Sequence, residues 1–541
     1  MTHRHERESS RRGPSRRRFI ELAATATAIP AAGFAVDKAL TANRSDAKKV
    51  SEAAKPTVLK PKRIVSENSL QGDPNWQITN LGAWQAMMGY AGQASVLPGE
   101  PVTLYASTTA PSFVVRAFRI GYYGGDLARL VWTSSTVPGH QQPQNTVISS
   151  TNTVSTSWEP SLTIPTDDWP EGSYLLRMDS EDGQRYVPVT VRSATTAGKT
   201  VIKNSTATWQ AYNTWGGYDL YNGPGGTADY NNRSLAVSLD RPYDVNGAYY
   251  FTWHEQKLIS LAEQLGMPLA YTTSMDIASD PNLLKGASAL FCLGHDEYWS
   301  PPERASVTAA RDAVLNVGFM GANTMFRRTR LDSTPLGQNR LVICYKTSYM
   351  EDPMYGVNNA LVTSDWREPP DPDPESSLTG TLYEANPVDA NFIVASPDSW
   401  VYANTGVQLG TSIPGLVGIE YDRVNPCYPV NRPIEVLSHS PLTCGGVNSY
   451  ADAAYYTTPS GAGVFNSGTM RFVASMNTIT EFGVNSSTWA FTTQVVTNLL
   501  QAFSDGPAAA KYPANDNLDQ MQEWPGDPIA AQHNLWPPIV L

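Results

Sequence analysis

The alternation of strand-like and helix-like segments after about residue 198 constrains the fold of this 541-residue chain more than any other feature. Apolar residues at helical spacing predict a helix over 257–265, and a β-rich run predicts a strand over 267–271. Another pair of strands then flanks a predicted helix over 302–315. Such alternation is typical of a parallel sheet with helices on both faces. We therefore predict a doubly wound α/β domain over 198–505.

The chain before this domain follows a different rhythm. Segments such as 114–120 and 173–178 alternate or run in β-forming residues, with Pro, Gly and Asp turns between them. Several short strands with such turns predict an all-β domain, a β-sandwich over 66–197. The residues 36–65 are rich in Ala, Lys and Ser and predict a linker, and the residues 506–541 predict a C-terminal tail.

The N-terminal sequence predicts export of a folded protein. Paired arginines in the run SRRRFI, at 15–20, precede an apolar stretch from Leu22 to Val36. That stretch is too short and too weakly hydrophobic for a transmembrane helix, so we expect no stable membrane insertion. It has the regions of a cleavable signal peptide, which we place at 1–35, and the arginines favour the twin-arginine pathway over ordinary secretion. We expect an extracellular or cell-envelope protein.

Charge and composition narrow the range of partners. The formal net charge is −11, which disfavours binding to nucleic acid or to an anionic membrane. Hydrophobic residues make up 41% of the chain, enough for a large core. We therefore expect a globular protein that binds neither nucleic acid nor an anionic membrane surface.

Four cysteines are few for an exported chain of this length, so we expect that disulfides do not determine the fold. Cys292 and Cys344 lie in apolar runs and are predicted to be buried and unreactive. Cys427 and Cys444 lie in loop sequence and could form a disulfide after export. None of the four has the spacing of a zinc site.

The strongest candidate for chemistry is the run GHDEYWS at 294–300. It places His295, Asp296 and Glu297 at the carboxyl end of a predicted buried strand, where α/β domains usually build their active sites. The alternative is structural, with Asp296 or Ser300 capping the following helix and Glu297 in solvent. Three polar groups at one strand end favour a functional role.

Two further loops follow predicted strands. The run TWQAYNTWGGYDLY at 208–221 is crowded with aromatic and amide groups, and by itself it favours a core or carbohydrate-contact role. The run GANTM at 321–325 could direct the amide of Asn323 into the same crevice. Because parallel strands end at the same edge of a sheet, these loops are expected to meet there.

Together these segments resemble the large (β) subunit family of N,N-dimethylformamidase, specifically its C-terminal domain. The resemblance covers roughly 110 to 500 and includes RIGYYGG, TWQAYNTWGGYDLY, GHDEYWS, GANTMFRR, CYK and ADAAYYTTPSGAG, in that order. The α/β domain is also similar to the glutamine-amidotransferase-like fold, which normally carries a Cys nucleophile at a strand-to-helix elbow. Here the elbow has Gly294-His295-Asp296 and Cys292 lies within the strand, which argues against a thiol mechanism.

The resemblance implies a mononuclear Fe(III) site with two tyrosines and one glutamate as ligands. Glu297 matches the family glutamate. Tyr218 is our choice for one tyrosine, with Tyr221 as its rival, and Tyr212 is our choice for the other. Phenolate and carboxylate oxygens are hard ligands that suit a ferric ion, which could polarise an amide carbonyl or lower the pKa of a bound water.

The resemblance also implies polar residues beside the metal. His295 and Asn323 match such positions and could stabilise an oxyanion, while Glu420 is a candidate proton shuttle. We therefore expect an exported, iron-dependent hydrolase of a small-molecule amide, as a homo-oligomer or with a separate small subunit.

Two other functions are open. A non-catalytic envelope or carbohydrate-binding protein could retain the fold and its aromatic loops. A glycan-active enzyme could use Asp296 and Glu297 as a carboxylate pair, although neighbouring residues at a strand end tend to point in different directions.

Overall fold

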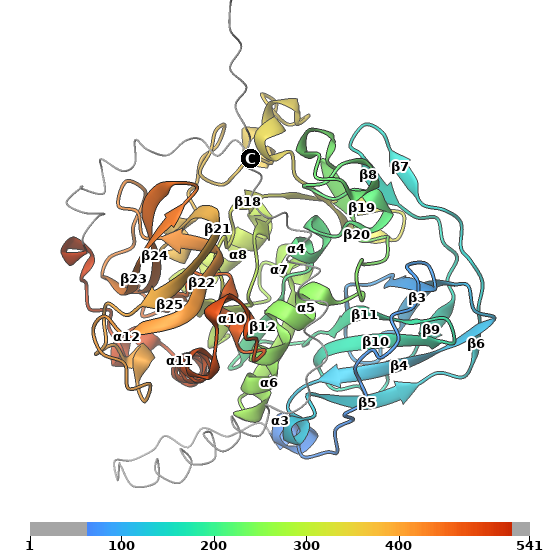
Figure 1. Cartoon of the computed structure of the whole chain (residues 1–541), viewed down its shortest axis with the longest axis horizontal. Helices are drawn as coiled ribbons and strands as arrows, with labels where there is room; N and C mark the ends of the chain where they lie inside the picture. Colours follow the sequence, from blue (N-terminus) through green and yellow to red (C-terminus); the bar gives the residue numbers. More distant parts are fainter. Residues whose placement is uncertain (1–61, 522–541) are drawn as a thin grey trace, which may run out of the picture. The chain divides into compact units, whose positions relative to one another are not determined.

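The computed structural model describes residues 62–521, which Figure 1 draws in colour. The predicted signal peptide (1–35) lies outside the described residues, as do the predicted linker up to residue 61 and the predicted tail after residue 521. The last residues of the predicted linker belong to a helix, α3 (Lys62–Glu67). All described residues fall within one compact unit.

Mostly antiparallel strands fill the first region, drawn from blue to cyan in Figure 1. One sheet has the order β1-β3-β9, and another has the order β2-β11-β10-β4-β5 with β6 paired to β4. Leu104 from the first sheet shares a core with Val115 and Leu176 from the second. An all-β region therefore precedes the α/β region, as predicted. The bounds are β1 (Met87–Ala91), β2 (Ser95–Val96), β3 (Val102–Thr108), β4 (Ser112–Ile120), β5 (Ala128–Thr133), β6 (Val137–Pro138), β7 (Thr146–Ile148), β8 (Thr153–Ser155), β9 (Leu162–Ile164), β10 (Gly172–Ser180) and β11 (Gln184–Val191).

A seven-stranded sheet organises the second region, in the order β14-β12-β15-β17-β25-β24-β23. All neighbours from β14 to β25 are parallel, whereas β24 and β23 add an antiparallel edge. The predicted alternation of strands and helices is thus confirmed for the parallel part. The bounds are β12 (Thr200–Asn204), β14 (Leu269–Thr273), β15 (Ala289–Cys292), β17 (Asn316–Phe319), β23 (Ile434–Cys444), β24 (Val447–Thr457) and β25 (Gly463–Asn466).

Helices cover both faces of this sheet. Ile202 and Phe291 belong to a core that includes residues of α6 and α11, while Val201 and Leu290 belong to a core that includes residues of α7 and α8. Burial on both faces explains why these strands read as continuous apolar runs. The bounds are α6 (Gln256–Gln264), α7 (Ser274–Ser279), α8 (Pro301–Asp312) and α11 (Ser486–Ser504). Within residues 62–521, none of the helices combines the length and apolar character needed to cross a membrane.

Smaller sheets and short helices surround the main sheet. Three sheets have the orders β13-β20-β19, β21-β22 and β16-β18. Their bounds are β13 (Ala236–Ser238), β16 (Tyr298–Trp299), β18 (Arg327–Arg328), β19 (Arg330–Thr334), β20 (Gly337–Ile343), β21 (Leu382–Ile393) and β22 (Ser412–Arg423). The remaining helices are α4 (Thr206–Ala211), α5 (Tyr249–His254), α9 (Ser376–Thr379), α10 (Arg471–Ser475) and α12 (Ala508–Lys511).

A buried ion pair joins the two regions. Arg119 on β4 contacts Glu263 on α6, with Nη2 2.5 Å from Oε1 and Nη1 2.9 Å from Oε2. The hydroxyl of Tyr271 also donates to Glu263. Both charged side chains are almost completely buried. Removal of either partner would leave the other charge buried and unpaired, at a cost of about 3–5 kcal/mol.

All four cysteines are free thiols. Cys292 and Cys344 are buried as predicted, and burial raises the pKa of both thiols, that of Cys344 to about 12. Cys427 is exposed and Cys444 is buried, and the structure forms no disulfide between them.

Candidate active site beside the parallel strand ends

Two glycines bring the loops after β15 and β17 into backbone contact. Gly294 has a φ of +44°, and a Cβ at this position would lie 2.3 Å from the carbonyl oxygen of His254. A Cβ at Gly321 would lie 1.5 Å from the carbonyl oxygen of Gly294. Only glycine fits at such close approaches. The residues that follow pair as β16 and β18, so the GHDEYWS and GANTMFRR segments lie side by side.

Glu297 is the centre of the site and is fully buried. Tyr221 Oη donates to Glu297 Oε1 at 2.7 Å, and Tyr212 Oη donates to Oε2. The two phenol oxygens lie 3.0 Å apart, and the rings stack with their centroids separated by 4.8 Å. Two phenols from one loop therefore converge on both oxygens of one carboxylate from another loop.

Positive charge keeps this carboxylate ionised. Arg327 Nε donates to Glu297 Oε1 at 3.2 Å, and Lys346 Nζ lies 3.1 Å from the centroid of the Tyr221 ring. Burial by itself would raise the pKa of Glu297, but hydrogen bonding to His295 and the charges of Arg327 and Lys346 outweigh burial and lower it. Burial lowers the pKa of Lys346 well below its ordinary value. Glu297 is thus an anion in a site with little water.

His295 lies between two carboxylates. Its Nε2 is 3.5 Å from Glu297 Oε2, and its Nδ1 is 3.7 Å from Glu420 Oε2. Asn323, with a φ of +57°, donates from Nδ2 to Glu420 Oε2 at 3.0 Å. The side-chain oxygen of Asn323 is buried and has no hydrogen-bond partner among the described residues. The structure therefore brings the predicted residues His295, Asn323 and Glu420 together beside Glu297.

Tyr218 lies elsewhere. Its ring packs beside a separate core cluster, as do Met88 and Leu336, and its carbonyl oxygen accepts a hydrogen bond from Arg241 Nη1 at 2.8 Å. Its rival Tyr221 occupies the place at the carboxylate that we had expected for Tyr218. Of the three proposed ligands, the structure thus brings Tyr212 and Glu297 together without Tyr218.

Three residues of the cluster were not among our predicted site residues. Tyr298 Oη donates to Tyr221 Oη at 2.7 Å, Arg327 donates to Glu297, and the Lys346 amine lies against the Tyr221 ring. All three lie within the motifs GHDEYWS, GANTMFRR and CYK. The available sequence signal for Arg327 and Lys346 was their place inside motifs that carry the family resemblance.

Asp296 points away from Glu297 into a second buried cluster. Lys203 Nζ lies 2.8 Å from Asp296 Oδ2 and also pairs with Glu303. The ammonium group lies 3.7 Å from the centroid of the Trp299 ring. Because Asp296 and Glu297 contact different partners, they do not act as a carboxylate pair across one substrate bond.

The oxygen set around Glu297 fits a hard cation. Oxygen ligands lie about 2 Å from a small cation, so that neighbouring ligand oxygens are about 3 Å apart. The contacts of Tyr221 Oη with Glu297 Oε1 and with Tyr212 Oη, at 2.7 and 3.0 Å, have this spacing. In the described part of the chain, no group of three or more His, Cys, Asp or Glu side chains could hold a metal ion. A metal at this site would therefore depend on the phenol oxygens.

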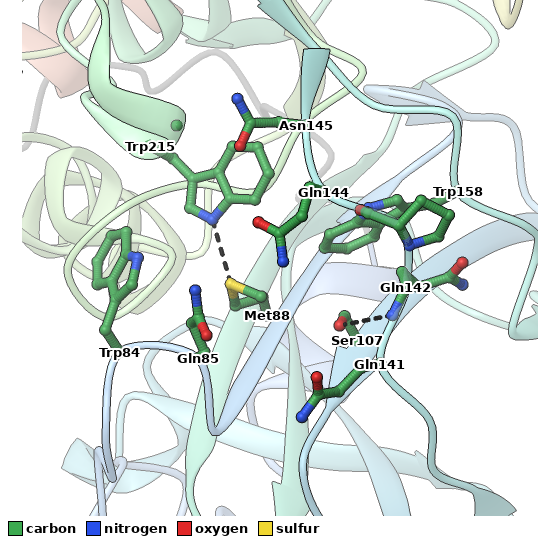
Figure 2. A pocket seen from close by; sticks show the side chains of 12 residues that line it. Trp84, Gln85, Met88, Ser107, Gln141, Gln142, Gln144, Asn145, Trp158 and Trp215 are labelled. Atoms are coloured by element: carbon green, nitrogen blue, oxygen red, sulfur yellow. Dashed lines mark hydrogen bonds between the residues drawn. The ribbon is translucent and has the colours of Figure 1, made fainter. Parts of the chain in front are cut away.

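A small surface hollow has a lining residue, Tyr250, that packs against the cluster. Trp209, Tyr243 and Tyr250 are among its lining residues, and the Tyr250 ring stacks on Tyr212 with the centroids 5.4 Å apart. A larger hollow has none of the cluster residues in its lining (Figure 2).

Comparison with known families matches residues 114–486 to the family described as N,N-dimethylformamidase beta subunit-like, C-terminal. This range contains every residue of the Glu297 cluster. No curated protein matches the chain.

Proposed function

Because the chain belongs to the N,N-dimethylformamidase beta subunit-like family, we propose that it hydrolyses the C–N bond of a small amide at the Glu297 cluster. The observation that supports this proposal best is the convergence of two phenols on both oxygens of one buried carboxylate. Burial of this carboxylate costs free energy, because the charged group must lose its hydration. A functional role accounts for that cost.

We propose that Tyr212, Tyr221 and Glu297 hold a mononuclear ferric ion. A free phenol titrates near pH ~10, so these side chains would become anionic ligands at neutral pH only beside a strongly charged cation. Bound there, the ion would polarise the amide carbonyl and lower the pKa of a water. We assign Tyr221 and not Tyr218 as a ligand, because Tyr221 contacts Glu297 whereas Tyr218 packs beside a separate core cluster.

His295, Glu420 and Asn323 supply the remaining chemistry in this proposal. His295 is placed to donate a hydrogen bond to the oxyanion that forms when water attacks the carbonyl carbon. Glu420 takes the proton of that water and passes it to the leaving amine as the C–N bond breaks. Asn323 orients Glu420 through its Nδ2, and its unpartnered oxygen accepts a hydrogen bond from the attacking water.

The proposal extends to fold details, location and assembly. We propose that the all-β region is a β-sandwich and that the α/β region has the glutamine-amidotransferase-like topology. Export through the twin-arginine pathway remains a proposal from the sequence alone. The family description names a beta subunit, which favours a separate partner subunit.

Metal content and spectrum test the proposal directly. The purified protein should contain about one iron per chain and absorb visible light through tyrosinate-to-iron charge transfer. It should also hydrolyse members of a panel of short N-alkyl formamides and acetamides. Protein with neither iron nor amide hydrolysis would instead support the non-catalytic alternative.

Matched variants localise the site. Glu297→Gln and Tyr221→Phe should each lose the iron and the visible band. Tyr218→Phe makes the same chemical change three positions away from Tyr221 and should retain both. Stoichiometric iron in Glu297→Gln would contradict the ligand assignment.

A further inference from the structure

The larger surface hollow has a lining unlike that of the Glu297 cluster. Its walls come from the residues before and at the start of β1, from β3, from the segment 141–145, from Trp158 and from the 208–221 loop (Figure 2). It encloses about 500 Å³ that is partly open to solvent. The lining residues are aromatic, amide, apolar or small, and none of them is charged: Trp84, Gln85, Met88, Ser107, Gln141, Gln142, Pro143, Gln144, Asn145, Trp158, Trp215 and Gly216.

Two of the three indoles are held rigidly in this hollow. Trp158 Nε1 donates to the carbonyl oxygen of Pro143 at 2.9 Å, and Trp215 Nε1 contacts Met88 Sδ at 3.3 Å. The two rings pack edge to face, with an interplanar angle of 87°. Trp84, in contrast, is 47% exposed. A fixed aromatic wall and one exposed indole therefore border the same space.

One amide side chain of the lining is held by hydrogen bonds within the protein, whereas four are available to a ligand. Gln142 is buried and satisfied, because its Nε2 donates to the carbonyl oxygen of Glu159 at 2.7 Å and its Oε1 accepts from the Glu159 N–H at 3.1 Å. The other four amide side chains form no hydrogen bond with any described residue: Gln85, Gln141, Gln144 and Asn145. Each offers donors and an acceptor to a ligand.

The chemistry of the lining residues indicates which class of ligand can bind in the hollow. The absence of lining charge disfavours phosphates, carboxylates and metal ions, which need a charged or charge-complementary site. Sugar rings combine apolar C–H faces with hydroxyls that both donate and accept hydrogen bonds, and so match indole faces flanked by amides. We propose that this hollow is a binding site for a neutral saccharide, with a sugar ring on Trp84 and its hydroxyls on the available amides.

The same loop serves both sites. Tyr212 and Tyr221 lie at the Glu297 cluster, and Trp215 between them in sequence lies in the hollow. A saccharide held there would place the catalytic cluster near a glycan surface. The binding proposal does not depend on amide hydrolysis.

Binding of defined saccharides to the intact protein tests this inference. The probes are neutral hexasaccharides of glucose (α- and β-linked), xylose and mannose, with oligogalacturonate as an acidic comparison, measured by calorimetry. We expect at least one neutral probe to bind and the acidic one not to bind. Failure of every neutral probe to bind would overturn the proposal.

Variants then locate the binding. Trp84→Ala and Gln144→Ala should each weaken binding at least tenfold, and both side chains are exposed, so the fold should tolerate their removal. Tyr355→Ala removes an aromatic side chain of similar exposure outside the hollow and should bind normally. Glu297→Gln should also bind normally, which separates this test from that of the proposed hydrolase. Unchanged binding in both Trp84→Ala and Gln144→Ala would place the saccharide elsewhere and refute the assignment.

Discussion

The two sides of the 294–300 loop hold buried carboxylates of different kinds. Asp296, on one side, pairs with Lys203, which it shares with Glu303. Glu297, on the other side, is contacted by the hydroxyls of Tyr212 and Tyr221.

The difference between the two clusters is in their partners and not in their burial. Asp296 and Glu297 are both almost inaccessible to solvent. The cation nearest to Glu297, Arg327, is shared with Asp365, at 2.5 Å. Each carboxylate thus shares one cation with another acid, and the clusters differ in that two phenol hydroxyls also donate to Glu297. A cation could take the place of those phenol protons. Partner chemistry therefore distinguishes the two acids, and under the proposed function Glu297 is the one that would hold a ligand.

The largest expected loss of stability follows from a change in the cluster around Asp296. Lys203→Met would leave two buried carboxylates without their cation and should lower the free energy of unfolding by about 3–5 kcal/mol. Urea denaturation at neutral pH would measure this loss. Glu297→Gln should cost less, about 1–2 kcal/mol, because the carboxamide keeps one acceptor for the phenols. Equal losses in the two variants would remove the distinction between the clusters.

A smaller expected effect is a pH dependence of the free energy of unfolding. Burial and the neighbouring Asp296 raise the pKa of Glu303 to about 7 although Lys203 opposes them, so the folded protein holds this proton more tightly than the unfolded chain does. The free energy of unfolding should therefore fall between about pH 4.5 and pH 7, by at most ~3 kcal/mol from this group.

Glu303→Gln provides the control for that slope, because the carboxamide cannot ionise. Stability curves measured across this pH range should differ between the variant and the parent protein, with the variant gaining relative stability above pH 7. Parallel curves would show that Glu303 does not titrate in this range.

The smallest effect distinguishes two neighbouring tyrosines. Tyr221→Phe removes a hydrogen bond to a buried carboxylate and should cost about 1–3 kcal/mol in the metal-free protein. Tyr218→Phe removes a hydroxyl with no contact to Glu297 and should change stability by less than about 0.5 kcal/mol. Thermal unfolding of both variants after chelation would measure the difference, and the reverse order would restore Tyr218 as the partner of Glu297.

The sequence was sufficient to predict those parts of the fold that depend on local pattern. The strands β15 and β17 are buried on both faces, so their apolar runs were visible, and the strand-end rule then located His295, Glu297 and Asn323. The choice between Tyr218 and Tyr221 depends on how the intervening chain turns, which spacing alone does not specify. Arg327 and Lys346 lie within motifs of the family resemblance, but their contacts with Glu297 and Tyr221 join distant segments, which no local pattern specifies.

The buried ion pair Arg119–Glu263 limits how far the two regions can evolve separately. Exchange of the all-β region by recombination would leave Glu263 on α6 without its guanidinium group unless the incoming region carried an arginine at the same place. Two compensating changes in separate segments are rare in a single genetic event. We therefore expect related chains to keep the two regions together and to differ first in their surface loops.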